Sequence, residues 1–321
     1  MIVGRGRVTR LRGAARRRWC GCLAAVAAAC GNGARKGRAP EAIHGDAQVA
    51  RSACANDAAE CPGACNAQGY CESDQGFGPE VRLPPARYAV DYELRAHQGI
   101  MNKDPALLVL AEPLWVSKRE SSVGDCRRCK DCKPKAFLEG VADDVPLELS
   151  FVDAQAFCKA TGRRLATPEE WQAAARGPSP CTDPNEVRDD RNGTTCNFRR
   201  YPWGDDQTSA ALCKYGYNSV CEERTGAHPI GPHPDYASPT GVEDLSGNVE
   251  EWVDGFWQGR PGVKGGHWDL MSTEPASLWL SLGIPGTYYN DYQNLPDLSL
   301  KGVRCVRGNP KFELKLRPAP I

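Results

Sequence analysis

The sequence predicts a mixed fold of helices and strands that is rich in loops and braced by disulfide bonds. Glycine and proline number 33 and 25 among 321 residues, which favours turns and loops over a helical bundle. The apolar run at 107–118 indicates one or two buried strands, whereas 150–162 and 166–177 show helical patterns. Sixteen cysteines exceed what a cytosolic protein usually contains outside metal sites, so they indicate disulfide bonds and export.

The segment 150–162 is predicted to be helical because its apolar residues recur at helical spacing. They are Phe151, Ala154, Phe157 and Cys158. Gly162 follows them and suits the position just after the last turn, where a left-handed backbone conformation is common. We therefore expect a short amphipathic helix whose apolar face contains Cys158.

The segment 166–177 is a clearer helix because both of its ends show signals. Thr167 and Glu170 have the spacing of a capping box, in which each side chain bonds the other residue's backbone N–H. Pro168 fits the first turn, where its missing N–H has no helical partner. Gly177 suits the end of the helix. Beyond this point regular periodicity fades and the sequence indicates turns and short segments.

The first 29 residues have the composition of a signal peptide, with seven arginines, no acid and an apolar run of about a dozen residues. Small residues before Cys30 are similar to a bacterial lipobox, in which this cysteine would become the lipidated N-terminus. Ordinary cleavage after the same residues is the alternative. No run approaches the roughly 20 apolar residues of a transmembrane helix, so a lipid anchor is the only membrane attachment that we expect.

The rest of the chain divides into three parts by composition. Residues 30–53 are small, basic and polar, which is typical of a flexible tether. Residues 54–79 form a small cysteine-rich segment that two disulfides would have to hold, because it has too few apolar residues for a core. A zinc knuckle is the alternative. Residues 80–321 form the globular domain.

Charge excludes one class of function. Without the leader the chain has 33 basic and 40 acidic residues, a net charge of −7. A body of this sign does not suit nucleic acid, whose phosphates attract basic patches. We therefore expect no nucleic-acid partner.

Six short motifs occur in order: "DAQAFCKATGRRLATPEEWQAAARG", "YPWG", "HPIG", "GVEDLSGNVEEWV", "GGHW" and "KGVRCVRG". Together they resemble the formylglycine-generating enzyme family, or sulfatase-modifying factor domain, over residues 105–308. The resemblance implies a compact α+β fold that is poor in regular secondary structure and related to C-type lectins.

The resemblance also implies a structural calcium ion around the Gly-Asn turn of the fourth motif. Carried over by position, Asp244 and Glu251 supply carboxylate oxygens, and Gly247 and Val249 supply backbone carbonyls. Calcium prefers six to eight hard oxygen ligands, which such a turn can provide. A hydrogen-bonded turn without metal is the alternative.

Disulfide pairing follows from the same resemblance. Family members join a cysteine on the first helix to one near the C-terminus, which here implies Cys158–Cys305. The other implied pairs are Cys129–Cys132, Cys181–Cys196 and Cys213–Cys221. Thirteen cysteines remain after Cys30, an odd number, and Cys126 is then the odd thiol. A metal or redox site at the C-x-x-C-x-x-C run is the alternative there.

The chain departs from the family at the positions that bind copper. The family's enzymes hold copper(I) with two cysteines five positions apart, because soft sulfur suits a soft ion. Leu270 and Pro275 stand at those positions here, so copper binding and formylglycine formation are not expected. His267 and Asp269 are the candidates for other catalysis, since such a couple can act as a general base. A hydrogen-bonded loop histidine is the alternative.

Two functions remain open. The first is a non-catalytic binding or scaffold protein of the bacterial cell envelope, whose partner is an unidentified protein or small molecule. The second is a divergent oxidoreductase that oxidises a protein or small molecule. The family's iron-dependent sulfoxide synthases of thiohistidine biosynthesis use an added domain with three histidine ligands. The five histidines here (44, 97, 228, 233 and 267) show no helical HxxxH pattern, so that activity is not expected.

Overall fold

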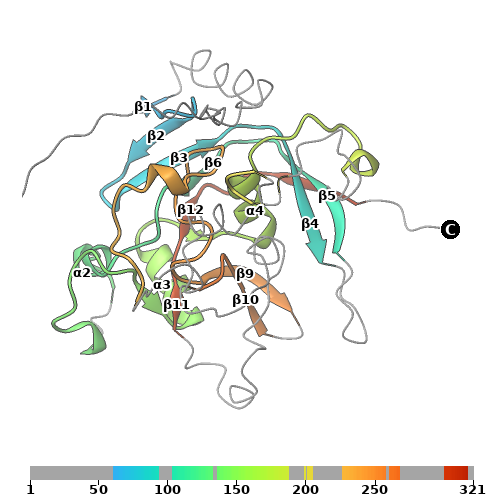
Figure 1. Ribbon diagram of the computed structural model, residues 1–321. Helices are drawn as coiled ribbons and strands as arrows, with labels where there is room; N and C mark the ends of the chain where they lie inside the picture. The colour runs from blue at the N-terminus through green and yellow to red at the C-terminus, as the bar shows by residue number, and fades with distance from the viewer. Residues whose placement is uncertain are drawn as a thin grey trace, which may run out of the picture. The chain divides into compact units, whose positions relative to one another are not determined.

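The computed structural model describes residues 61–93, 103–132, 136–187, 199, 201–204, 226–257, 260–267 and 300–316. All of these residues belong to one compact unit, Ala42–Ile321. Within them the chain forms three β-sheets and a few short helices (Figure 1). None of the helices in these ranges has the length and apolar character needed to cross a bilayer.

The largest sheet has six strands in the order β1-β2-β3-β6-β12-β8. Their bounds are β1 (Ala64–Cys65), β2 (Cys71–Asp74), β3 (Pro79–Leu83), β6 (Leu114–Ser117), β12 (Cys305–Arg307) and β8 (Arg164–Leu165). Every neighbouring pair is antiparallel. Strand β12, near the C-terminus, lies between β6 and β8. The sheet therefore joins the last of the six motifs to the first motif and to the strand that precedes it.

Two smaller sheets have the orders β10-β9-β11-β7 and β13-β5-β4. Their bounds are β4 (Arg87–Glu93), β5 (Lys103–Leu110), β7 (Glu148–Leu149), β9 (Glu251–Trp257), β10 (Arg260–Lys264), β11 (Lys301–Gly302) and β13 (Phe312–Leu316). The run 107–118 therefore contributes to two strands, β5 and β6, in different sheets. In the parallel pair β9–β11, Gly302 lies opposite Glu251, which brings the last motif beside the Gly-Asn turn.

The helices are α2 (Val123–Arg128), α3 (Phe151–Ala160) and α4 (Pro168–Arg176), with 3-10 turns η1 (Ala136–Leu138), η2 (Pro184–Glu186) and η5 (Pro234–Tyr236). Both predicted helices are confirmed. The Thr167 side chain accepts the Glu170 N–H at 3.2 Å, and the Glu170 carboxylate accepts the Thr167 N–H at 2.9 Å. Gly177 ends α4 with φ +76°, a conformation that favours glycine.

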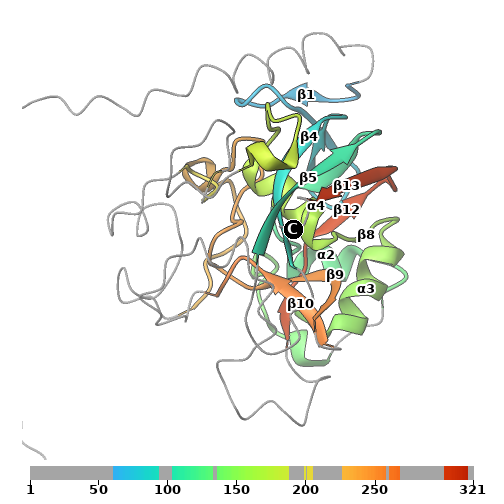
Figure 2. The same cartoon turned by 90° about the vertical axis from the view of Figure 1, so that its right-hand side faces the viewer.

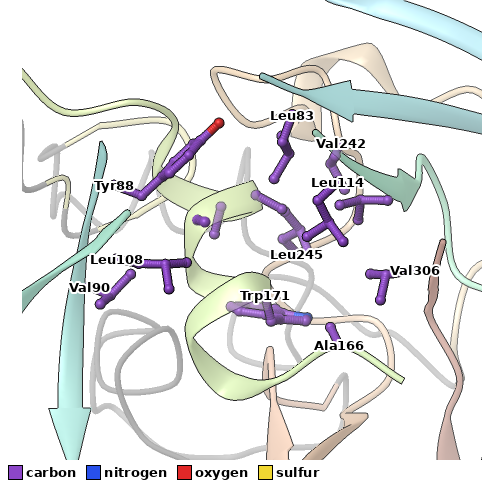
Figure 3. Packing of buried hydrophobic residues seen from close by; sticks show 14 of the residues in the cluster. Leu83, Tyr88, Val90, Leu108, Leu114, Ala166, Trp171, Val242, Leu245 and Val306 are labelled. Carbon is purple, nitrogen blue, oxygen red and sulfur yellow. The ribbon is translucent and has the colours of Figure 1, made fainter. Parts of the chain in front are cut away.

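The main core surrounds α4, which contacts β4, β5, β9 and β10 (Figure 2). Trp171 is the large side chain of this helix that points into the core, and it is 2% exposed. Val242 and Leu245, from the loop before β9, lie among the same side chains (Figure 3). The loop that precedes the Gly-Asn turn is thus anchored in the core rather than lying on the surface.

The cysteine-rich segment is joined to the domain across the expected boundary at residue 79. Strand β2 pairs with β3, where Glu72 lies opposite Val81. The Asn66 side chain also donates to the Thr240 carbonyl at 3.0 Å. A Cys61–Cys71 disulfide holds the segment itself. From Cys61 onward it therefore forms the edge of the largest sheet.

Two of the implied disulfides are present among the described residues. Cys158–Cys305 joins α3 to β12 with a Cα–Cα distance of 5.5 Å, and Cys129–Cys132 lies after α2. Cys126, on α2, is buried beside the second bridge and is not part of it. Cys181 is disulfide-bonded. Its implied partner, Cys196, lies outside the described residues, as does the pair Cys213 and Cys221.

Candidate functional site

Two histidines and a buried carboxylate meet in the segment 228–244, which precedes β9. The Nδ1 atom of His233 lies 2.9 Å from Oδ2 of Asp244, and Nε2 of His228 lies 3.4 Å from Oδ1. The two imidazole rings meet edge to face, with 4.1 Å between their centroids. One ligand-type atom from each of the three residues falls within 4.8 Å of the others. Among the described residues, this is a set of donors that could hold a metal ion.

The core fixes the backbone around Asp244. Val242 and Leu245 are fully buried on either side of it. Asp244 itself adopts φ +58°, in the left-handed region that few residues other than glycine, asparagine and aspartate occupy. Non-glycine residues in this conformation often mark functional sites, since the surrounding structure has to impose it. The carboxylate is therefore placed by the packed fold.

Each histidine is held through its own backbone N–H. The N–H of His228 donates to Oδ1 of Asn248 at 2.9 Å, and the N–H of His233 donates to Oε2 of Glu243 at 2.9 Å. Asn248 has φ +60° and donates its amide to Glu120 at 2.6 Å. Both histidines are thus fixed by side chains from the stretch that contains Asp244.

The electrostatics of the trio keep Asp244 charged. Burial acts to raise the pKa of Asp244, but hydrogen bonds from His228 and His233 outweigh it and hold the pKa below its ordinary value. The hydrogen bond to Asp244 raises the pKa of His233, against the opposing effect of burial. The lowered pKa therefore favours the ionised form of Asp244, whose carboxylate faces the two imidazoles.

A second buried cluster surrounds Arg304, between β11 and β12. Its Nε and Nη2 atoms donate to both oxygens of Glu251 over 2.7–3.0 Å. The same guanidinium donates to the carbonyls of Ser117 and Glu243, each at 2.9 Å. Trp171 donates its indole N–H to Oε2 of Glu251 at 2.7 Å. This ion pair ties α4, β6, β9 and the Asp244 loop together inside the protein.

A comparison with protein-family models gives one decisive match. The model described as "Sulfatase-modifying factor enzyme 1-like domain" covers residues 87–308, more than half of the chain. The chain belongs to this family. The mixed, disulfide-bonded fold described above is consistent with the family fold that the six motifs implied.

Curated relatives of the family align with part of the chain. Hercynine oxygenase of Mycolicibacterium thermoresistibile is 32% identical over 126 residues, 39% of this chain and 24% of that protein. The mouse protein named inactive C-alpha-formylglycine-generating enzyme 2 is 30% identical over 141 residues, 39% of this chain and 40% of that protein. The chain thus spans about a quarter of the length of the hercynine oxygenase that it matches.

Two solved structures match much of the chain at low sequence identity. Treponema denticola variable protein 1 is 15% identical with a TM-score of 0.43, and the match covers 74% of this chain and 98% of that one. PvdO from Pseudomonas aeruginosa is 16% identical with a TM-score of 0.42, covering 72% and 95%.

The calcium ion that the family resemblance implies does not fit the arrangement of Glu251. A carboxylate offers about four lone-pair positions, and Glu251 already accepts four hydrogen bonds from Arg304 and Trp171. Asp244 faces the two histidines instead. The Gly247 N–H donates to the Gly265 carbonyl at 2.8 Å. The two carboxylates of the implied set therefore have different partners, and calcium binding through Val249 and its neighbours stays a prediction.

The candidate catalytic couple after β10 is described in part. His267 is half-buried and is not one of the three clustered donors. Asp269 lies outside the described residues, as do Leu270 and Pro275. His228 and His233 were not predicted as site residues, because they lie in a loop and do not have the helical spacing expected of paired histidine ligands. Two histidines five positions apart, shortly before an acidic Gly-Asn motif, were the available signal.

Glu120 is a further buried carboxylate that no local pattern marks. It is 2% exposed, and it accepts the Asn248 amide at 2.6 Å and the Val249 N–H at 3.4 Å. Burial first, and then the charges of Asp244 and Glu251, raise the pKa of Glu120 well above its ordinary value. The protonated, neutral form of Glu120 is therefore favoured at this place in the fold.

Substituting Glu120 with glutamine should flatten part of the pH dependence of stability. The folded state holds the Glu120 proton more tightly than the unfolded chain, whose glutamates titrate near about 4.3. The free energy of unfolding of the wild type therefore falls as pH rises above that value, until the proton has also left the folded state. The Glu120→Gln protein lacks this loss, so its stability relative to wild type should rise with pH.

Urea unfolding between about pH 4 and pH 8, in chelator, measures this difference. The exposed Glu139→Gln substitution is the control, and its curve should run parallel to that of the wild type. A constant difference between Glu120→Gln and wild type across this range would contradict the raised pKa.

Proposed function

We propose that this chain is a non-catalytic member of the sulfatase-modifying factor family that binds a protein or small molecule in the bacterial cell envelope. The observation that carries the proposal is the identity of two residues, Leu270 and Pro275, at the positions of the family's copper-binding cysteines. Neither side chain can bind copper(I) or undergo thiol redox chemistry. The name of the mouse relative, an inactive formylglycine-generating enzyme, supports a non-catalytic role within this family.

The purified chain should not convert a sulfatase peptide to formylglycine. The test incubates it with copper, oxygen, a thiol reductant and a peptide that contains the C-x-P-x-R motif. Mass spectrometry then detects the aldehyde. The Mycobacterium tuberculosis relative named formylglycine-generating enzyme is a suitable positive control. Turnover above a no-protein control would overturn the proposal and favour the divergent oxidoreductase.

We propose in addition that the protein is exported and anchored by a lipid on Cys30. The support is the arginine-rich, apolar leader followed by small residues and this cysteine. In a bacterial host, a fatty-acid analogue should label the wild-type protein and not Cys30→Ser. A wild-type protein without label would rule out the lipid anchor. Label retained in Cys30→Ser would show that the lipid is attached to a different residue.

A further inference from the structure

We propose that His228, His233 and Asp244 form a binding site for a divalent first-row transition metal ion, with zinc as the first ion to test. The three side chains offer two nitrogens and one oxygen within 4.8 Å of one another. Imidazole and carboxylate ligands are those that zinc and its neighbours use in proteins. Calcium prefers oxygen throughout, so the two histidines argue against it at this place. The inference is independent of the proposed lack of catalysis.

The outer hydrogen bond of His228 supports the assignment. Its Nδ1 atom lies 3.2 Å from the Pro229 carbonyl oxygen. A carbonyl can only accept, so Nδ1 holds the proton and, in the neutral ring, Nε2 presents a lone pair. That lone pair faces Oδ1 of Asp244 at 3.4 Å. Either a proton on Nε2, which hydrogen-bonds Asp244, or a metal ion bound by both atoms can lie between them. Metal-bound histidines commonly donate their other ring N–H to a backbone carbonyl in this way.

The scaffold holds the ligands in place before an ion arrives. Asn248 and Glu243 fix the backbone of the two histidines, and the buried neighbours of Asp244 fix the carboxylate. Ligands locked by surrounding bonds and packing lose little freedom on binding, which favours affinity. This arrangement differs from a chance meeting of mobile surface side chains.

The local charge and exposure also suit a cation with open coordination positions. The Asp244 carboxylate supplies one negative charge among the three ligand residues, which suits a divalent cation held with two imidazoles. The Asp244 side chain is 1% exposed, whereas those of His228 and His233 are 11% and 23% exposed. Solvent therefore reaches the trio from the histidine side, where a water or external ligand could complete the coordination of the ion.

The test uses the untagged full-length chain, stripped with chelator and desalted. Isothermal titration measures binding of Zn²⁺, and Co²⁺ reports the ligand geometry through its visible ligand-field bands. We expect one equivalent of metal. His233→Ala and His228→Ala should each weaken binding by at least about 10-fold, the lower end of the loss seen when even an outer-shell partner is removed. The cobalt bands should change in both variants.

Two further variants make the result decisive. Asp244→Asn removes the charge and keeps a residue that tolerates the left-handed conformation, so it should stay folded and bind more weakly. His267→Ala removes a histidine outside the trio and should bind like wild type. Circular dichroism and melting without metal check the folding of each variant. Equal zinc binding by wild type and the two folded histidine variants would overturn the site. Binding of Ca²⁺ in preference to Zn²⁺, unchanged by the histidine substitutions, would also overturn it.

Discussion

Substituting Arg304 with alanine should lower the free energy of unfolding by about 3–5 kcal/mol, because it leaves a buried carboxylate without its partner. Arg304 is 1% exposed and Glu251 is fully buried. The guanidinium also donates to the carbonyls of Ser117 and Glu243, which would lose these hydrogen bonds. A buried charge without its ion-pair partner lowers stability. Each lost hydrogen bond to a buried carbonyl lowers it further, because water does not replace the donor inside the core.

Urea unfolding followed by tryptophan fluorescence measures this loss. Lys315→Ala is the matched control, because it breaks an exposed ion pair with Glu313 and should change stability by less than about 1 kcal/mol. The double variant Arg304→Met, Glu251→Gln removes both charges and should recover part of the loss. An Arg304→Ala protein as stable as the lysine control would show that the ion pair does not contribute as its burial implies.

The helices were predictable because their signals are local. Thr167 and Glu170 are three residues apart, and their capping box depends on nothing beyond the first turn of α4. The same holds for the apolar face of α3, from which Ala154 and Phe157 enter the second hydrophobic cluster. Only the choice of sheet for the run 107–118 needed information from distant strands. A local sequence pattern can predict that a segment is a strand. Which strand it pairs with depends on segments that are distant in sequence.

The site could be predicted only in part, for the same reason. The Gly-Asn motif marked Asp244 and Glu251 as important, and both are buried at the centre of polar networks. Their partners were not predictable, because Arg304 is 53 positions from Glu251 in sequence and the histidines lie in a loop without periodicity. The family resemblance assigned both acids as oxygen ligands of a calcium ion. The partners that surround them here change what each carboxylate can bind.

The cysteine-rich segment shows a further limit of composition. Four cysteines and few apolar residues suggested a part held by its own disulfides, and Cys61–Cys71 is one such bridge. The backbone of β2 nevertheless pairs with β3, since an exposed sheet edge accepts another strand whatever its side chains. Backbone hydrogen bonds leave little trace in composition, so this continuity could not be inferred.

Removing the Cys158–Cys305 disulfide should cost about 3–5 kcal/mol of unfolding free energy, because the bridge closes a long loop and so restricts the unfolded chain. The two cysteines are 147 positions apart in sequence, and both are fully buried. The chain-entropy model makes the effect grow with the logarithm of loop length. The bridge also joins α3 to β12, whose neighbour Arg304 is the centre of the buried ion pair.

The double variant Cys158→Ala, Cys305→Ala avoids a stray thiol and can be compared with Cys129→Ala, Cys132→Ala. The second bridge spans 3 positions, so the same model limits its effect to about 2 kcal/mol. Under oxidising conditions, the melting temperature of the variant without Cys158–Cys305 should be clearly lower than that of the variant without Cys129–Cys132. Adding reductant to the wild type should lower its melting temperature. If both double variants melt together, the stabilisation does not come from restricting the unfolded chain. The contribution of Cys158–Cys305 would then be the local packing of two buried sulfur atoms against α3.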